Sequence, residues 1–159
     1  ATFTATGFTT IYEPAAGGGS GGFYYKLAGA ETSVAVSNDA GTTKGGCAII
    51  SYTSAAYGGS DGGAFSTTSA PNSGAVTAAV DDIVLAAVVV DEGPSITAIP
   101  SGYTERINVL LGSVSNGVTI GVADKAITSA GSEDPGAWTA PFGPGGAICV
   151  YITILITGV

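Results

Sequence analysis

Asp81-Asp82-Ile83-Val84-Leu85-Ala86-Ala87-Val88-Val89-Val90-Asp91 contains the longest uninterrupted apolar run of the chain, residues 83–90. Acidic residues bound the run on both sides, and it is far shorter than the roughly 20 residues that a membrane-spanning helix requires. Val and Ile dominate it, and short β-branched runs between turn-forming residues are typical of buried strands. We therefore expect a buried β-strand here.

Further apolar runs recur on both sides of this segment, separated by clusters of Gly, Ser, Thr and Asn. The expected strands are residues 23–27, 32–36, 47–52, 75–80, 107–114, 118–122 and 147–156. Asn116-Gly117 favours a type I′ turn and therefore a hairpin, whereas the glycine-dense residues 57–63 are expected to form a loop. No segment has a helical pattern. The sequence predicts an all-β chain, a single-domain β-sandwich of jelly-roll type.

The N-terminal segment leaves two interpretations open. With 159 residues the chain is long enough for one domain with its own core. Residues 1–22 are expected to be an N-terminal strand or arm with a glycine-rich hinge at residues 17–22, and residues 23–159 the β-sandwich domain. Phe3, Phe8, Ile11 and Tyr12 are more apolar than a loose terminus should be. The segment is either the first strand of the sandwich or an arm that reaches a neighbouring subunit.

A loose internal echo links two parts of the chain. Residues 24–31, followed by residues 45–52, resemble residues 123–133, followed by residues 145–151. Each copy has a strand with a lysine (Lys26 or Lys125), a loop with Gly and an acidic residue, and a Gly-Gly turn into an apolar strand. Two such units would pack as the halves of one β-sandwich, and a chance resemblance between two hairpins is the alternative.

The charge balance excludes several classes of partner. The chain has 4 basic and 12 acidic residues, and its formal net charge is −8. Binding to phosphate backbones requires clusters of Lys and Arg, so we expect no nucleic-acid partner. The same balance argues against binding to an anionic membrane surface. An acidic, Ser/Thr-rich exterior fits a solvent-facing shell.

The residues for common catalytic sites are missing from the sequence. The chain has no histidine, which excludes Ser-His-Asp and Cys-His arrangements. The acidic pairs are Asp81-Asp82, Asp91-Glu92 and Glu133-Asp134, and neighbours in a strand point to opposite faces, so none is a facing catalytic pair. No acidic loop alternates ligands as a calcium-binding EF-hand does. We expect turn and loop residues here, no enzyme, and no catalytic, cofactor-binding or metal-binding residues.

Both cysteines and most aromatic residues are expected in the core. Cys47 and Cys149 lie in apolar runs, where cysteine behaves as a small buried hydrophobe, so two free, buried thiols are predicted, with one disulfide as the alternative. The aromatic side chains are expected to fill the core with their polar tips at its edge, and a sugar-stacking platform is the alternative. They are Tyr12, Tyr24, Tyr25, Tyr52, Tyr57, Tyr103, Tyr151 and Trp138.

Several short motifs follow one another from about residue 46 onward. They are Ala48-Ile49-Ile50-Ser51-Tyr52, Asp82-Ile83-Val84-Leu85-Ala86, Pro100-Ser101-Gly102-Tyr103-Thr104, Ala123-Asp124-Lys125, Gly131-Ser132-Glu133, Ala137-Trp138-Thr139 and Ala147-Ile148-Cys149-Val150-Tyr151. Their order resembles a β-sandwich module of bacterial and phage proteins, found in virion proteins and in secreted adhesive or carbohydrate-associated proteins. Tyr103 stands where tryptophan is common in that module. The motifs are structural, so the resemblance transfers no functional residue.

As a single acidic domain with little basic surface, the chain resembles a tailed-phage virion structural protein, and most directly a bacteriophage capsid decoration (cement) protein on the outer surface of the virion. Its partner would be the major capsid protein, its oligomeric state a homotrimer, and its mechanism adhesion through buried area. The alternative is a receptor- or carbohydrate-binding module of a phage tail or fibre, or a secreted, extracellular adhesin. Residues 1–7 lack the basic region and apolar core of a secretory signal, and the sequence leaves open whether a signal has been removed.

Overall fold

The computed structural model describes residues 3–13, 21–29, 33–38, 46–66, 70–91, 96–113, 117–140 and 149–158. Within these ranges every regular element is a β-strand and no helix is assigned, so the prediction of an all-β chain is confirmed. The strands are β1 (Phe3–Ala5), β2 (Thr9–Tyr12), β3 (Phe23–Tyr25), β4 (Val36–Asn38), β5 (Ala56–Ser66), β6 (Val76–Ala78), β7 (Ile83–Asp91), β8 (Thr104–Leu111), β9 (Val118–Ala126), β10 (Gly131–Glu133) and β11 (Cys149–Thr157).

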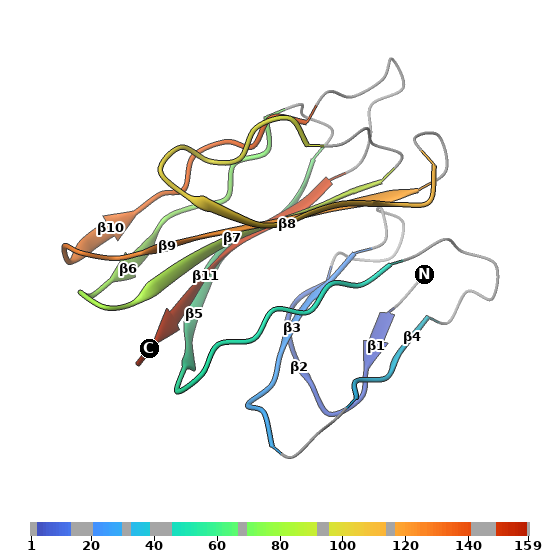
Figure 1. Ribbon diagram of the computed structural model, residues 1–159, viewed down its shortest axis with the longest axis horizontal. Helices are drawn as coiled ribbons and strands as arrows, with labels where there is room; N and C mark the ends of the chain where they lie inside the picture. Colours follow the sequence, from blue (N-terminus) through green and yellow to red (C-terminus); the bar gives the residue numbers. More distant parts are fainter. Residues whose placement is uncertain are drawn as a thin grey trace.

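Five strands form one antiparallel sheet in the order β5-β11-β7-β9-β8 (Figure 1). β7 is the apolar run of the sequence, and it lies in the middle, between β11 and β9. Alternate side chains of a strand point to opposite faces. Val84 and Val88 accordingly belong to one buried cluster, and Leu85 and Ala87 to the other. Because both faces of β7 are covered, its sequence does not alternate between polar and apolar residues.

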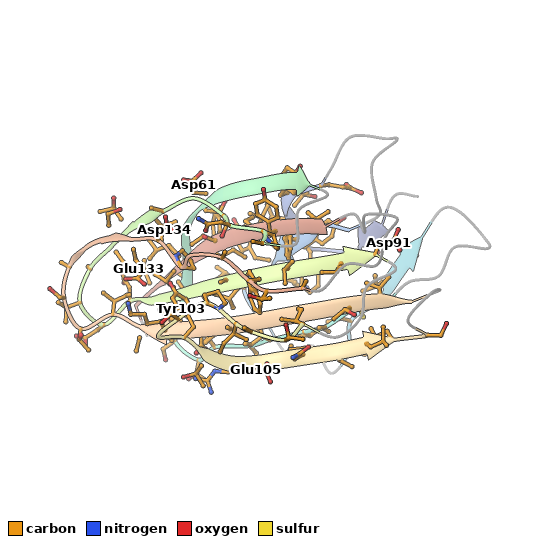
Figure 2. All side chains as sticks on the ribbon, turned by 90° about the horizontal axis from the view of Figure 1, so that it is seen from above. Asp61, Asp91, Tyr103, Glu105, Glu133 and Asp134 are labelled. Carbon is orange, nitrogen blue, oxygen red and sulfur yellow. The ribbon has the colours of Figure 1, made fainter. Side chains whose placement is uncertain are left out.

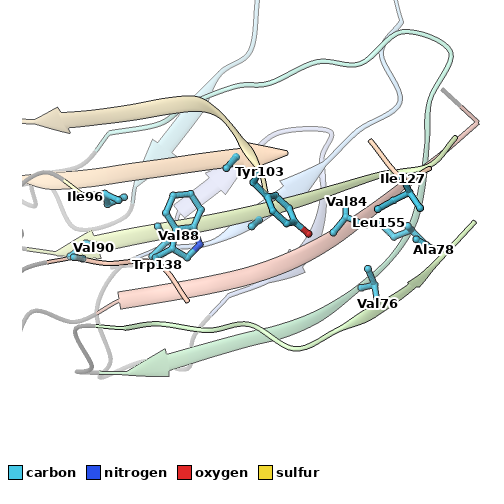
Figure 3. Packing of buried hydrophobic residues seen from close by; sticks show 13 residues of the cluster. Val76, Ala78, Val84, Val88, Val90, Ile96, Tyr103, Ile127, Trp138 and Leu155 are labelled. Atoms are coloured by element: carbon cyan, nitrogen blue, oxygen red, sulfur yellow. The ribbon is translucent and has the colours of Figure 1, made fainter. Parts of the chain in front are cut away.

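One face of the sheet is covered by the small sheet of β6 and β10 and by the segments that carry Ile96, Tyr103 and Trp138. Trp138 is only 1% exposed, and Figure 3 shows its ring beside Val88. Gly121 of β9 makes this packing possible, because a Cβ there would collide with Ile96 Cδ1 and lie 3.0 Å from the Trp138 ring. The prediction that Trp138 fills the core is therefore confirmed.

The opposite face is covered by N-terminal residues. β2 pairs with β3, and Ile11, Tyr12 and Phe23 pack against the second buried cluster, which includes residues of β7, β9 and β11. Gly21 approaches the sheet closely, since a Cβ there would lie 3.4 Å from Val89 Cγ1. β1 pairs with β4 in a further two-stranded sheet. The N-terminal strands thus pair within their own chain, and residues 17–20 of the expected hinge lie outside the described residues.

The expectation of a loop at residues 57–63 is wrong, because these residues lie in β5, an edge strand paired with β11. Two register shifts along the β5–β11 pair absorb irregular backbone at Gly59 and Gly62, whose φ angles are +141° and +83°. Gly62 also lies directly under Ser73, where a Cβ would be 3.0 Å from Ser73 Cβ. The glycines therefore allow β-bulges in β5 and allow Ser73 to approach its backbone closely, both of which are known roles of glycine in sheets.

The expectation of a buried strand at residues 47–52 is also wrong. Residues 46–52 form no strand, and Ile49 is 60% exposed, although Ile50 and Tyr52 pack against the second buried cluster. A Cβ at Gly46 would collide with Leu111 Cδ1, so the segment lies against a face of the sheet. Its counterpart in the internal echo is β11, a strand inside the sheet. The two copies therefore occupy different structural positions, and the prediction of two equivalent halves fails.

The hairpin expected around Asn116-Gly117 is present, because β8 pairs antiparallel with β9. Its connection is longer than the expected two-residue turn. Leu111 pairs with Val118, so residues 112–117 make the connection, and Gly112 has a φ of +103°. Asn116 itself lies outside the described residues.

Truncation of Trp138 is expected to destabilise the protein strongly. Trp138→Ala empties a site in contact with β7 and β9, and such changes cost about 3–5 kcal/mol of the free energy of unfolding. Urea unfolding measures the loss, with Leu27→Ala as the control, because Leu27 is 67% exposed and its truncation should change stability by less than about 0.5 kcal/mol. A Trp138→Ala variant with full stability and lost glycan binding would instead make the ring a ligand platform.

Candidate functional site

Two consecutive residues of β9, Asp124 and Lys125, organise the ionic groups of the sheet. Successive residues of a strand point to opposite faces, so each begins a separate cluster. Arg106 Nε donates to Asp124 Oδ1 at 2.8 Å, and the Tyr52 hydroxyl donates to Asp124 Oδ2 at 2.7 Å. The Asp124 side chain is only 5% exposed. Both of its oxygens have partners, which is what a buried carboxylate requires.

The second cluster joins β9 to β10. Lys125 Nζ donates to Glu133 Oε1 at 2.8 Å and to Oε2 at 2.9 Å, and the Tyr103 hydroxyl donates to Oε1 at 3.1 Å. The ammonium also lies 5.8 Å from the centre of the Tyr103 ring, within the range of a cation–π contact. Figure 2 shows Tyr103, Glu133 and Asp134 at the same end of the molecule. These groups are satisfied by one another and hold the two sheets together.

In these surroundings the pKa values of the Tyr52 and Tyr103 hydroxyls are both raised. Burial, followed by the neighbouring carboxylate, raises the pKa of Tyr52 and of Tyr103 above the ordinary value of 10.0. Burial also raises the pKa of Tyr24, with a smaller contribution from Glu13. All three hydroxyls remain protonated donors at neutral pH.

Of the acidic pairs identified in the sequence, Asp81-Asp82 lies at a turn, whereas Asp91 and Glu133 each end a strand. Asp82 is buried, and its Oδ2 accepts a hydrogen bond from the Ala79 amide at 2.8 Å, while Asp81 has a φ of +71° at the turn before β7. Asp134 Oδ1 accepts from the Gly136 amide at 2.9 Å. Asp91 ends β7, and Glu92 lies outside the described residues. The carboxylates of Asp82 and Asp134 thus stabilise backbone turns, and that of Glu133 belongs to the Lys125 cluster.

Two further observations concern metals and membranes. Within the described ranges, no three His, Cys, Asp or Glu side chains are grouped as metal ligands. The same part of the chain has no helix with the length and apolar character needed to cross a membrane.

Most of the aromatic residues are in or against the core, but one pair differs. Tyr25 of β3 and Tyr57 of β5 are half-buried, and their rings stack with centroids 4.4 Å apart and an interplanar angle of 19°. The Tyr57 and Ser60 hydroxyls are hydrogen-bonded, with the oxygens 2.9 Å apart. The pair fastens the N-terminal hairpin to the β5 edge of the sheet.

A groove of about 330 Å³ lies between β5 and β6. It is lined by Gly58, Gly59, Ser60, Asp61, Ala75, Val76, Thr77 and Leu155. Figure 2 shows Asp61 at the β5 edge of the molecule, on the opposite side from Glu105 of β8. The groove differs from the sequence prediction, in which residues 57–63 form a loop. No local signal distinguishes a bulged glycine-rich strand from a glycine-rich loop, so only the pairing with β11 identifies it.

One of the two cysteines differs from expectation. Cys47 is free, as predicted, but it is exposed, because residues 46–52 run along the surface rather than inside a sheet. Cys149 begins β11, and its side chain lies outside the described residues.

Comparisons of this chain with protein-family models, with curated proteins and with solved structures find no match. Functional inference therefore depends on the residues and geometry given above.

Alkaline pH is expected to destabilise the fold through Tyr52 and Tyr103. Their pKa values are raised above the ordinary 10.0 in the folded protein, so above that pH the unfolded chain loses protons that the folded chain retains. Their contribution is complete below about pH 10 and is lost as the pH rises further. Urea unfolding between about pH 8 and pH 11 should show this fall. The double variant Tyr52→Phe/Tyr103→Phe should flatten it, and an equally steep fall in that variant would contradict the assignment.

The exposed thiol of Cys47 is expected to react in the native protein. Ellman's reagent should show one rapid reaction without denaturant, because the side chain is exposed and free. Cys47→Ser should remove this rapid phase. If the native wild-type protein reacts only after denaturation, the thiol is protected and the assignment is wrong.

Proposed function

We propose that this chain is a virion structural protein, a bacteriophage capsid decoration (cement) protein that binds the major capsid protein on the outer surface of the shell. One observation carries the proposal. Of the five large hydrophobic side chains that are exposed in the described residues, four lie between residues 27 and 49. They are Leu27 (67%), Val34 (37%), Val36 (41%) and Ile49 (60%). We call these four the apolar surface set.

The apolar surface set lies outside the five-stranded sheet. Val36 is in β4, Leu27 follows β3, and Ile49 is in the segment before β5. Figure 1 shows these blue-to-teal elements together on one side of the five-stranded sheet. The charged residues within 27–49 are Glu31, Asp39 and Lys44, and all three lie outside the described residues. Several exposed apolar side chains on neighbouring elements are typical of the centre of a protein–protein interface.

The proposed mechanism is adhesion without chemistry. The apolar surface set would be buried against capsid protein, and the hydrophobic effect would hold neighbouring capsid subunits together through the shared area. The ionic groups of β9 are already satisfied within the chain, which suits a rigid structural element. The proposal includes a homotrimer, in which one decoration unit contacts several capsid subunits.

The finer fold assignment is part of the same proposal. The sandwich is proposed to be of jelly-roll type, because β11 lies between β5 and β7, two strands that come much earlier in the chain. Such long-range antiparallel neighbours are a property of Greek-key and jelly-roll connections.

Co-sedimentation with capsid shells tests the proposed function. The shells are assembled from the major capsid protein encoded in the same genome, and the wild-type chain should sediment with them in a saturable manner. Leu27→Glu/Ile49→Glu should weaken binding at least about tenfold, because charges would be placed in an apolar contact. Val80→Glu is the matched control, since Val80 is 52% exposed but lies between β6 and β7. It should bind as the wild type does.

Light scattering after size-exclusion chromatography tests the trimer separately, and unchanged melting of each variant shows that it is folded. Wild-type protein that does not sediment with the shells, or equal loss in the Val80→Glu control, would overturn the proposal.

A further inference from the structure

The groove beside β5 lies between two strand edges that belong to different sheets. Gly58, Gly59, Ser60 and Asp61 of β5 form one wall, and residues 75–77 at β6 form the other. Leu155 of β11 also lines it. Its volume of about 330 Å³ lies at the small end of the range of ligand sites, about 300–1,000 Å³. A ligand the size of one sugar ring fits such a space.

The lining combines apolar and polar groups in a specific way. Val76 and Leu155 are nearly buried, at 8% and 9% exposure, and supply an apolar surface. Ser60, Thr77 and Asp61 are exposed and supply two hydroxyls and a carboxylate. A pyranose ring has the matching chemistry, with an apolar C–H face and hydroxyl groups at its edge. Among the described residues that line the groove, Asp61 is the only charged one, so an anionic sugar would be repelled.

The polar groups of the groove are held in place before any ligand binds. Asp61 Oδ1 accepts a hydrogen bond from the Gly62 amide at 2.7 Å, and Oδ2 lies against Gly74, where a Cβ would collide with it. Ser60 is hydrogen-bonded to Tyr57, which is stacked on Tyr25. Fixed groups lower the entropy cost of binding.

We propose that the groove between β5 and β6 binds a neutral hexose unit of a glycan. The Asp61 carboxylate would accept a hydrogen bond from one sugar hydroxyl, and the Thr77 hydroxyl would donate to another. Val76 and Leu155 would contact the C–H face of the ring. This inference is independent of the proposed capsid contact, because the apolar surface set lies on other elements. A decoration protein with this site would also attach the particle to glycan-bearing surfaces.

Titration of the ¹⁵N-labelled protein with neutral methyl hexosides, followed by NMR, tests the proposal. The probes are methyl α-D-glucopyranoside, methyl α-D-mannopyranoside and methyl β-D-galactopyranoside. At least one of them should cause saturable shifts of the amides of residues 58–61 and 75–77. Thr77→Val should weaken binding about fivefold, as expected for one neutral hydrogen bond, and Asp61→Asn about tenfold or more. Thr104→Val, an exposed position on the opposite edge strand β8, should bind as the wild type does.

Several outcomes would overturn the proposal: no saturable shift with any of the three sugars, shifts that are unchanged in both groove variants, or tighter binding of the anionic sugar sialyllactose. The two functional proposals are distinguished by their variants. Thr77→Val should leave capsid co-sedimentation unchanged, and Leu27→Glu/Ile49→Glu should leave hexose binding unchanged.

Discussion

Strand β7 has β11 on one side and β9 on the other, and apolar side chains cover both of its faces. This double burial imposes the rest of the architecture, because a sheet with two apolar faces needs a covering layer on each. Trp138 and the β6–β10 sheet provide one layer. The N-terminal hairpin of β2 and β3 provides the other, together with Ile50 and Tyr52. The β6–β10 and β2–β3 sheets are therefore needed to bury the two faces of the large sheet.

The parts of the fold that could be predicted from sequence are those with strong local patterns. Residues 83–90 were recognised as a strand because their composition alone requires burial, and the β8–β9 hairpin because two apolar runs flank a turn. Residues 57–63 were not recognised, since their strand character depends on pairing with the apolar β11 and on bulges at Gly59 and Gly62. Residues 47–52 show the opposite error, because a strand is predicted there and none is present. Their apolar character is real, but only Ile50 and Tyr52 are used for packing, and Ile49 faces the solvent.

The polar contacts show a similar division. That Asp124 and Lys125 point to opposite faces follows from strand geometry, but their partners depend on strand register and on how separate segments pack. Tyr52 precedes β5, Tyr103 and Arg106 lie at the start of β8, and Glu133 lies in β10. The groove had no sequence signal at all, because its two walls belong to different sheets and its only charged residue, Asp61, lies in a run of glycines. A groove between two sheets can be recognised only when the strand order is known.

The position of β11 between β5 and β7 has a consequence for the order in which the protein can fold. β7, β8 and β9 are close together in the sequence and can associate early, whereas the partner of β5 lies roughly 90 residues further along the chain. Until β11 arrives, β5 has no neighbour to hold its glycine-rich backbone, and one apolar side of β7 has no strand beside it. The large sheet is therefore completed late, when β11 pairs with the open edge of β7 and β5 pairs with β11. Slow folding and transient exposure of β7 are inherent costs of this strand order.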